Sequence, residues 1–238
     1  MKFRSITLAA YVSTLMLGCA ADPGTQPHDM SATQHEAMAK QEEQAGDTHA
    51  EQHDPNAKAA TQTCSGKGGC WTSVSNPTAQ HAEDAEKHRK LAKEHRAASA
   101  ALVNAEASAC AGISDDDRDI SPFYHREDIQ SVGPLSETVK SGKGSTTKVV
   151  GSTVVFRALP GMTAEWLQRV VDCHLARAAA MGHQMPEMDY CPLELKGAKA
   201  NVTSVGNGFA VNVSAGDDAT VAEIRKRAEG LKTPMAAN

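Results

Sequence analysis

Cysteine, histidine and methionine side chains gather in one part of this sequence, between residues 162 and 192. Thiolate and imidazole are ligands for Zn(II), and thiolate and thioether select Cu(I), so the stretch predicts binding of zinc or copper. The candidate metal ligands are Cys173, His174, Met181, His183, Met185, Met188 and Cys191. A structural alternative assigns these residues to a disulfide, a buried hydrogen-bonded histidine and adaptable packing by methionine, with no cofactor required. Both interpretations stay open at this point.

The cysteines also predict disulfides. Of the six cysteines, one lies in the N-terminal segment and five follow it, an odd number. Cys64 and Cys70 bound a short glycine-rich loop and are expected to form a local disulfide, and Cys173 and Cys191 are the second expected pair. This pairing leaves Cys110 as an unpaired thiol.

A thiol-dependent enzyme is a further hypothesis, with Cys173 or Cys110 as the nucleophile. His174 follows Cys173 directly, but neighbouring helical side chains diverge by about 100°, so His125 or His183 would have to activate the thiol. The sequence contains no nucleophile elbow, paired acid and base, or cofactor-binding loop. No catalytic residue is therefore assigned.

The N-terminal segment resembles the signal peptide of bacterial lipoproteins. Lys2 and Arg4 precede an apolar run that is too short to span a bilayer, and the run ends in LMLGC, a lipobox-type motif closed by Cys19. The resemblance implies that residues 1–19 are a signal peptide and that Cys19 is lipidated, with acyl chains such as palmitate in the bilayer. Ala20 follows Cys19, where many lipoproteins retained in the inner membrane have Asp. The expected location is therefore the outer membrane, with the protein facing the periplasm.

The composition excludes some classes of partner and limits the core. The net charge of −5 argues against nucleic-acid binding, which requires a basic surface. Aromatic residues make up 4% of the chain and the mean hydropathy is −0.41, so a large core is not expected.

The chain between the signal peptide and the compact domain divides into two expected parts. Residues 20–63 almost lack large aliphatic side chains and predict a disordered tether, whose scattered His and Met could hold copper or zinc loosely. Residues 64–112 predict the Cys-Gly loop and a long helix with a narrow apolar stripe. His81, His88 and His95 recur every seven residues beside this stripe. Histidines seven residues apart on one helix are about 10 Å apart, so they cannot share one ion and are interpreted as a polar flank to a partner-facing stripe.

Residues 127–232 predict the compact domain. Alternating β-branched residues indicate strands, and Gly206-Asn207-Gly208 indicates a hairpin between the last two of them. The fold class is α+β, a two-layer sandwich of a four-stranded, mostly antiparallel sheet with two helices. Its order of elements resembles a ferredoxin-like fold that lacks the last strand. The expected elements are strands at 129–137, 149–158, 198–205 and 209–214 and helices at 164–181 and 218–231.

These features together predict a membrane-anchored periplasmic lipoprotein, most simply a non-enzymatic protein that interacts with an envelope protein or has a structural role. Transition-metal binding or sequestration through Cys, His and Met is the alternative, and a thiol-dependent enzyme is the second alternative. The expected partners are the lipid bilayer, contacted through Cys19, and a protein of the envelope.

Overall fold

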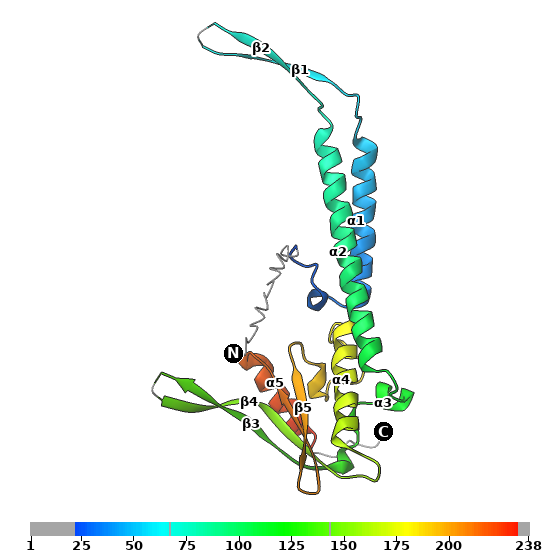
Figure 1. The fold of residues 1–238 in the computed structure, drawn as a ribbon, viewed down its shortest axis with the longest axis vertical. Coiled ribbons are helices and arrows are strands. Elements are labelled where there is room, and N and C mark those ends of the chain that lie inside the picture. The colour runs from blue at the N-terminus through cyan, green and yellow to red at the C-terminus, as the bar shows by residue number, and fades with distance from the viewer. Residues whose placement is uncertain (1–21, 67, 143, 233–238) are drawn as a thin grey trace, which may run out of the picture.

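A computed structural model describes residues 22–66, 68–142 and 144–232. The predicted signal peptide and the predicted lipidation site, Cys19, lie outside these residues. Figure 1 shows a long helical hairpin that rises from a compact domain of helices and strands and carries a two-stranded hairpin at its far end. We refer to the helical hairpin, α1 (Ala32–Gln52) and α2 (Ala79–Ala109), as the arm.

Nearly half of the segment predicted to be a disordered tether is a helix, so that prediction was wrong for residues 32–52. Helix α1 begins at a capping box in which the Ser31 hydroxyl accepts a hydrogen bond from the Gln34 amide and the Gln34 side chain accepts one from the Ser31 amide. Alanine favours helix, Ala32 and Ala39 of α1 are buried, and α1 packs along α2 (Figure 1). This packing offsets the entropy lost when α1 becomes ordered. Small side chains are sufficient for it, so large aliphatic residues are not needed.

Helix α2 confirms the predicted long helix, and it packs along α1. Small residues allow the two helices to approach closely: Ala85 and Ala92 of α2 are buried, and a Cβ atom on Gly46 of α1 would lie 3.3 Å from the Ala85 carbonyl oxygen. At a rise of about 1.5 Å per residue, α2 is about 46 Å long. The arm is therefore an antiparallel helix pair with a narrow core of small side chains.

The Cys-Gly loop is the turn of a β-hairpin made of β1 (Ala59–Cys64) and β2 (Cys70–Ser75). The predicted disulfide between Cys64 and Cys70 is confirmed. We call this hairpin the tip of the arm (Figure 1). Every residue of β2 is exposed, and so are five of the six residues of β1, so the tip contributes nothing to a core.

The compact domain contains a four-stranded antiparallel sheet in the order β3-β4-β6-β5. The predicted combination of helices with an antiparallel sheet is confirmed, and β3 and β4 extend further than predicted because their polar outer halves pair with each other from Ser136 to Gly144. Val154 and Val211 of the sheet join one core cluster with residues of two helices, including Leu167 and Ile224. The elements are α3 (Asp115–Asp119), β3 (Ile129–Ser141), β4 (Gly144–Arg157), α4 (Ala164–Ala180), β5 (Lys199–Val205), β6 (Gly208–Ser214) and α5 (Asp218–Gly230).

A disulfide joins the arm to the compact domain, and it is not the predicted one. Cys110, at the C-terminal cap of α2, is bonded to Cys173 in α4, while Cys191 is free and buried. The predictions of a Cys173–Cys191 bond and of an unpaired Cys110 were therefore wrong. The reason is tertiary: α2 packs against α4, which places residues separated by 63 positions in contact.

Candidate functional site

Two of the predicted metal ligands, Cys173 and His174, have structural partners in the fold. Cys173 is in a disulfide and offers no thiolate, and His174 is buried with its Nε2 atom 2.9 Å from the Asp117 carbonyl oxygen. The Nε2–H group donates this hydrogen bond, and burial lowers the pKa of His174 below its ordinary value of 6.5. His174 is therefore a neutral, structural side chain that holds the segment of α3 against α4.

The loop after α4 is organised around a buried carboxylate. The side chain of Glu194 accepts a hydrogen bond from the Met185 amide and lies 3.2 Å from the Arg227 guanidinium. The Nδ1 atom of His183 lies 2.7 Å from the Glu194 carbonyl oxygen, and burial lowers the pKa of His183. Met185 is buried, whereas Met181, another predicted ligand, is exposed. The buried Glu194 carboxylate, paired with Arg227, therefore holds this loop in place.

Cys191 is the one free thiol among the described residues, and it is buried. Burial raises the pKa of the thiol to about 11, and the Ser121 hydroxyl lies 3.2 Å from Sγ. The thiolate is the nucleophilic form, so a raised pKa removes reactivity at neutral pH. Cys173 and Cys110, the nucleophiles of the enzymatic hypothesis, are bonded to each other.

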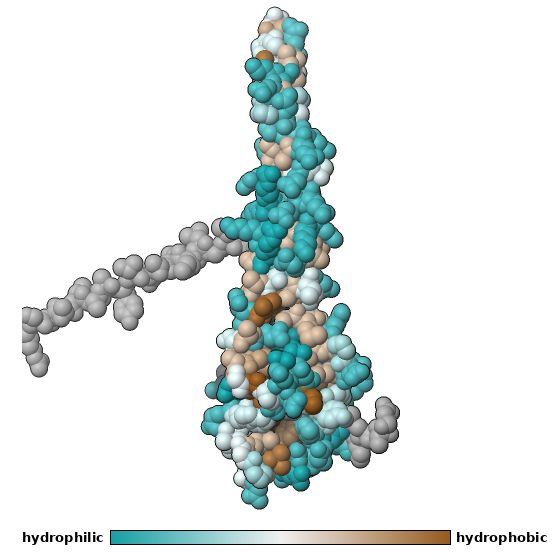
Figure 2. Space-filling view, turned by 90° about the vertical axis from the view of Figure 1, so that its right-hand side faces the viewer, coloured by the Kyte–Doolittle hydropathy of each residue, from teal (hydrophilic) through white to brown (hydrophobic). Residues whose placement is uncertain are grey.

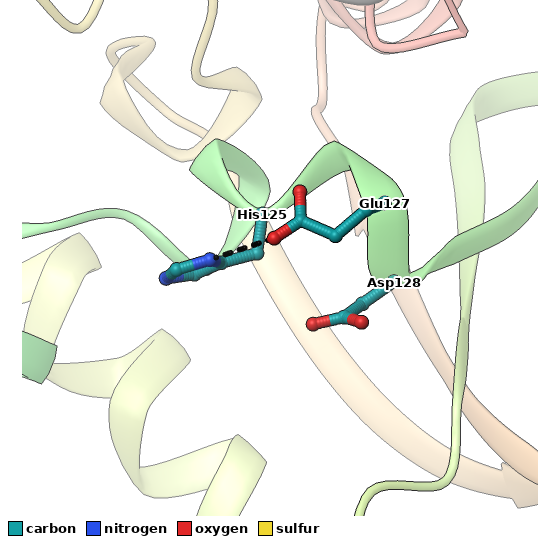
Figure 3. A group of neighbouring side chains, drawn as sticks. All are labelled: His125, Glu127 and Asp128. Atoms are coloured by element: carbon teal, nitrogen blue, oxygen red, sulfur yellow. Dashed lines mark hydrogen bonds and ion pairs between the residues drawn. The ribbon is translucent and has the colours of Figure 1, made fainter.

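A group of three potential metal ligands lies at the start of the sheet, with His125 and Glu127 exposed and Asp128 buried. Figure 3 shows His125, Glu127 and Asp128, whose ligand atoms lie within 4.8 Å of one another; within the described ranges no other three Cys, His, Asp or Glu side chains meet that distance. The Asp128 carboxylate is already paired with Arg157, whose Nη2 atom is 2.6 Å away. A guanidinium at that distance opposes a second cation, so this group is a weak candidate for a metal site.

A cavity of about 250 Å³ adjoins this group. Its wall is mostly apolar, from side chains such as Trp166, Met162 and Phe156, with His125 and Asp128 also among its lining residues. A cavity of this size and lining suits a small apolar ligand, but the polar groups at its edge are engaged with Arg157 and Glu127.

The arm contains a second arrangement of titratable side chains that the sequence predictions missed. Because α1 and α2 are antiparallel, a step of seven residues forward in α1 corresponds to a step of seven residues backward in α2. One side chain from each helix meets in each of three layers. The Nδ1 atoms of His35 and His95 are 3.0 Å apart, the Glu42 carboxylate is 2.6 Å from Nδ1 of His88, and the Nδ1 atoms of His49 and His81 are 3.1 Å apart. We call these six residues the histidine seam.

The layer of the histidine seam nearest the compact domain is its most buried layer. His35 and His95 are buried, and Nε2 of His35 has no hydrogen-bond partner. Burial, followed by the neighbouring His35, lowers the pKa of His95, against the attraction of Glu42 and Glu94. Two neutral imidazoles can share one proton across Nδ1, but two charged imidazoles at this distance would repel.

A seven-residue spacing was the signal that could have found the seam. The sequence analysis noted it for His81, His88 and His95, but His35 and His49, with Glu42 between them, have the same spacing in the segment interpreted as disordered. Two matched heptads of this kind are typical of an antiparallel helix pair.

The tip of the arm exposes large apolar side chains. Trp71 is 56% exposed and Val74 is 64% exposed. Figure 2 shows an arm that is mostly hydrophilic, with an isolated hydrophobic spot near its end.

Comparison of the chain with protein-family models, with curated proteins and with solved structures gives no match, so its candidate sites are argued from their own geometry.

Proposed function

We propose that this protein is a lipid-anchored, non-enzymatic protein of the bacterial cell envelope that presents the tip of its arm to a protein partner. The observation that carries the proposal is the position of Trp71 and Val74, exposed on a hairpin at the far end of a helical arm (Figure 1).

The hairpin at the tip has little stability of its own, because no other described part of the protein packs against its strands. A two-stranded hairpin is marginal in water, and the strands of the tip bury no side chain. The Cys64–Cys70 disulfide limits the unfolded states of the tip and so favours its hairpin form. Tryptophan is enriched at the centres of protein interfaces, because it buries a large area and loses little conformational entropy. A covalently closed hairpin with an exposed Trp71 suits binding to another protein.

The arm suits presentation at a defined distance. Its length of about 46 Å is comparable with the thickness of a bilayer including its head groups. At its base α2 is held to α4 by the Cys110–Cys173 disulfide, and Arg177 of α4 lies 3.4 Å from the Glu106 carboxylate of α2. The direction of the arm is therefore set by the compact domain. The tip is held at a fixed distance from that domain, where a partner can bind it.

Anchoring rests on the resemblance of residues 1–19 to a lipoprotein signal. Among the described residues, no helix has both the length and the apolar character needed to cross a membrane. We therefore assign membrane attachment, at the outer membrane, to lipidated Cys19. Changing Cys19→Ala should move the protein from the membrane fraction to the soluble fraction, and a variant that stays in the membrane fraction would refute lipid anchoring.

For the compact domain we propose a two-layer, ferredoxin-like sandwich. In the order β3-β4-β6-β5, strand β3 precedes the β-α-β-β-α unit and takes the edge position that the missing last strand would occupy. This supports the architecture as a circular rearrangement of the ferredoxin-like order. Such a fold hosts many functions and carries no information about the partner.

A photo-cross-linking residue at the tip tests the proposed interaction. Replacing Trp71 with a photoreactive aromatic residue, in bacteria that express the full chain, should give one discrete adduct in the envelope fraction on irradiation. The same residue at Val139, which is exposed on the β3-β4 hairpin, is the matched control and should give none. Equal adducts at both positions, or none at the tip, would refute the tip as the binding surface.

A further inference from the structure

We propose that the tip of the arm binds the tip of a second copy of this chain, through antiparallel pairing of β2 with β2. The inference rests on the proposed function, because it names the protein partner that the tip binds. Figure 1 shows the tip extending away from the rest of the described chain, so both edges of its hairpin are open to another molecule.

The outer edge of β2 carries backbone groups that no other strand of the described chain pairs. At the turn, the Ser65 amide donates a hydrogen bond to the Gly69 carbonyl, 2.8 Å away. Bonded and non-bonded pairs alternate along an antiparallel ladder, so the next pair, Cys64 and Cys70, is a non-bonded pair, and its Cα separation of 4.0 Å agrees. By the same alternation, the N–H and C=O groups of Thr72 point away from β1.

The edges of the four-stranded sheet are protected, whereas those of the tip are not. At the β5 edge, the side chain of Gln168 accepts a hydrogen bond from the Val202 amide at 2.6 Å. The β3 edge contains Pro134, which has no N–H group, and its ladder shifts register at two places. Charged side chains and proline commonly protect a free edge, but Ala59–Cys64 and Cys70–Ser75 contain neither. An open, uncharged strand of this kind is a template for the addition of another strand.

Strand β2 is complementary to itself. An antiparallel pair with its two-fold axis at Thr72 places outward-facing backbone groups opposite one another, with Thr72 facing its own copy and Cys70 facing Val74. No like charges meet, because β2 contains no charged residue. Trp71 then faces Ser73, and the two Trp71 side chains are diagonal neighbours about 7–8 Å apart, within reach of each other. The exposed indole of each copy is thus covered by the other.

Strand β2 suits this pairing better than β1. It contains Trp71, Thr72 and Val74, which are aromatic or β-branched, whereas β1 begins with two alanines. Pairing turns two hairpins into one four-stranded sheet in the order β1-β2-β2-β1. A single hairpin is marginal in water, and three or more strands with an apolar face are needed for independent stability. The second copy therefore supplies what the tip lacks.

Sedimentation velocity of the purified full chain in a non-ionic detergent tests the pairing, and we expect a concentration-dependent dimer. Thr72→Pro removes an outward N–H group from each copy and should weaken the dimer more than about tenfold. Gln62→Pro is the matched control, because Gln62 pairs with Thr72 across the hairpin and its N–H group points to the opposite edge. This control should keep the dimer.

A second variant leaves the backbone edge intact. Trp71→Ala should weaken the dimer about tenfold or more, because tryptophan at the centre of an interface buries a large area. Mass spectrometry should find the Cys64–Cys70 disulfide in every variant, which shows that the hairpin is closed. A monomer at all concentrations of the unmodified chain, or equal weakening by Gln62→Pro and Thr72→Pro, would overturn the pairing through β2.

The photo-cross-link at Trp71 separates this inference from the proposed function. Peptide mapping of the adduct should find only the sequence of this chain, joined to itself within β2. An adduct with a different protein would overturn the second copy as the partner and would leave the tip as the binding surface. Absence of any adduct at the tip would refute both.

Discussion

Cys110 and Cys173 form a disulfide that joins the end of the arm to the middle of α4, across 63 residues of sequence. The bond lies where α2 meets α4, close to the ion pair between Glu106 and Arg177. The arm and the compact domain are therefore covalently joined at their contact, and the direction of α2 depends on α4.

The double variant Cys110→Ser, Cys173→Ser should be less stable by about 4 kcal/mol, because a disulfide that closes a loop of this length strongly restricts the unfolded chain. Denaturant unfolding of the non-reduced proteins measures the difference. The matched control is Cys64→Ser, Cys70→Ser, which opens the exposed tip and should leave unfolding of the compact domain nearly unchanged. A peptide map that links Cys173 to Cys191 would contradict the structure.

Cys191 should resist alkylation in the folded protein. With a pKa of about 11, roughly one thiol in a thousand is ionised at pH 8, and the side chain is buried. Mass spectrometry should find Cys191 unmodified by iodoacetamide under native conditions and fully modified in denaturant. Rapid modification of the native protein would restore the hypothesis of a reactive thiol.

The protein should lose stability as the pH falls below about 6.5. Burial lowers the pKa of His95, His174 and His183 in the folded state, so the unfolded chain binds more protons just below the ordinary value of 6.5. Stability rises with pH wherever the unfolded state binds more protons. The stabilising contribution of these neutral histidines is therefore fully present above pH 6.5, and it is lost as the pH falls from 6.5 toward their lowered pKa values. Thermal melting between pH 7.5 and 5 measures this.

Replacing the buried pair should weaken this pH dependence. The variant His35→Leu, His95→Leu removes His95, whose pKa is lowered by burial, together with its neighbour His35, and it places an apolar layer in the arm. Its melting temperature should fall less between pH 7.5 and 5 than that of the unmodified protein, with the remaining decrease due to His174 and His183. His125→Gln, at an exposed site, should show the unmodified pH dependence. An equal decrease in all three proteins would show that His95 does not contribute to the pH dependence.

Gly46→Leu should separate the helices of the arm. A Cβ atom at this position would already lie 3.3 Å from the Ala85 carbonyl oxygen, so a leucine side chain cannot fit between α1 and α2. We expect a loss of about 1–3 kcal/mol, the usual cost of overpacking, and early proteolysis within residues 32–52. Gln44→Leu adds the same side chain at an exposed position of α1 and should leave proteolysis unchanged. Equal resistance of both variants would show that the helices are not closely packed.

The sequence by itself determined the elements whose signals are local. Thr163, whose hydroxyl accepts a hydrogen bond from the Trp166 amide, and Gly182, with a positive φ of 69°, bound α4 close to where they predict its ends. The Cys64–Cys70 pair was predictable because only a short glycine-rich loop separates the two residues. These features depend only on contacts between residues that are a few positions apart in the chain. They can therefore be predicted from the sequence alone.

Tertiary structure decided everything that depends on distant contacts. Residues 32–52 have little apolar character of their own, and they are helical because Ala39 and Gly46 allow close approach to α2. Cys110 pairs with Cys173 because α2 packs against α4, and Cys191, the nearer cysteine in sequence to Cys173, is buried with a free thiol. His49 and His81 become neighbours only in the folded arm. Packing between helices brings these residues together. The spacing of residues within one segment does not predict which other segment will pack against it.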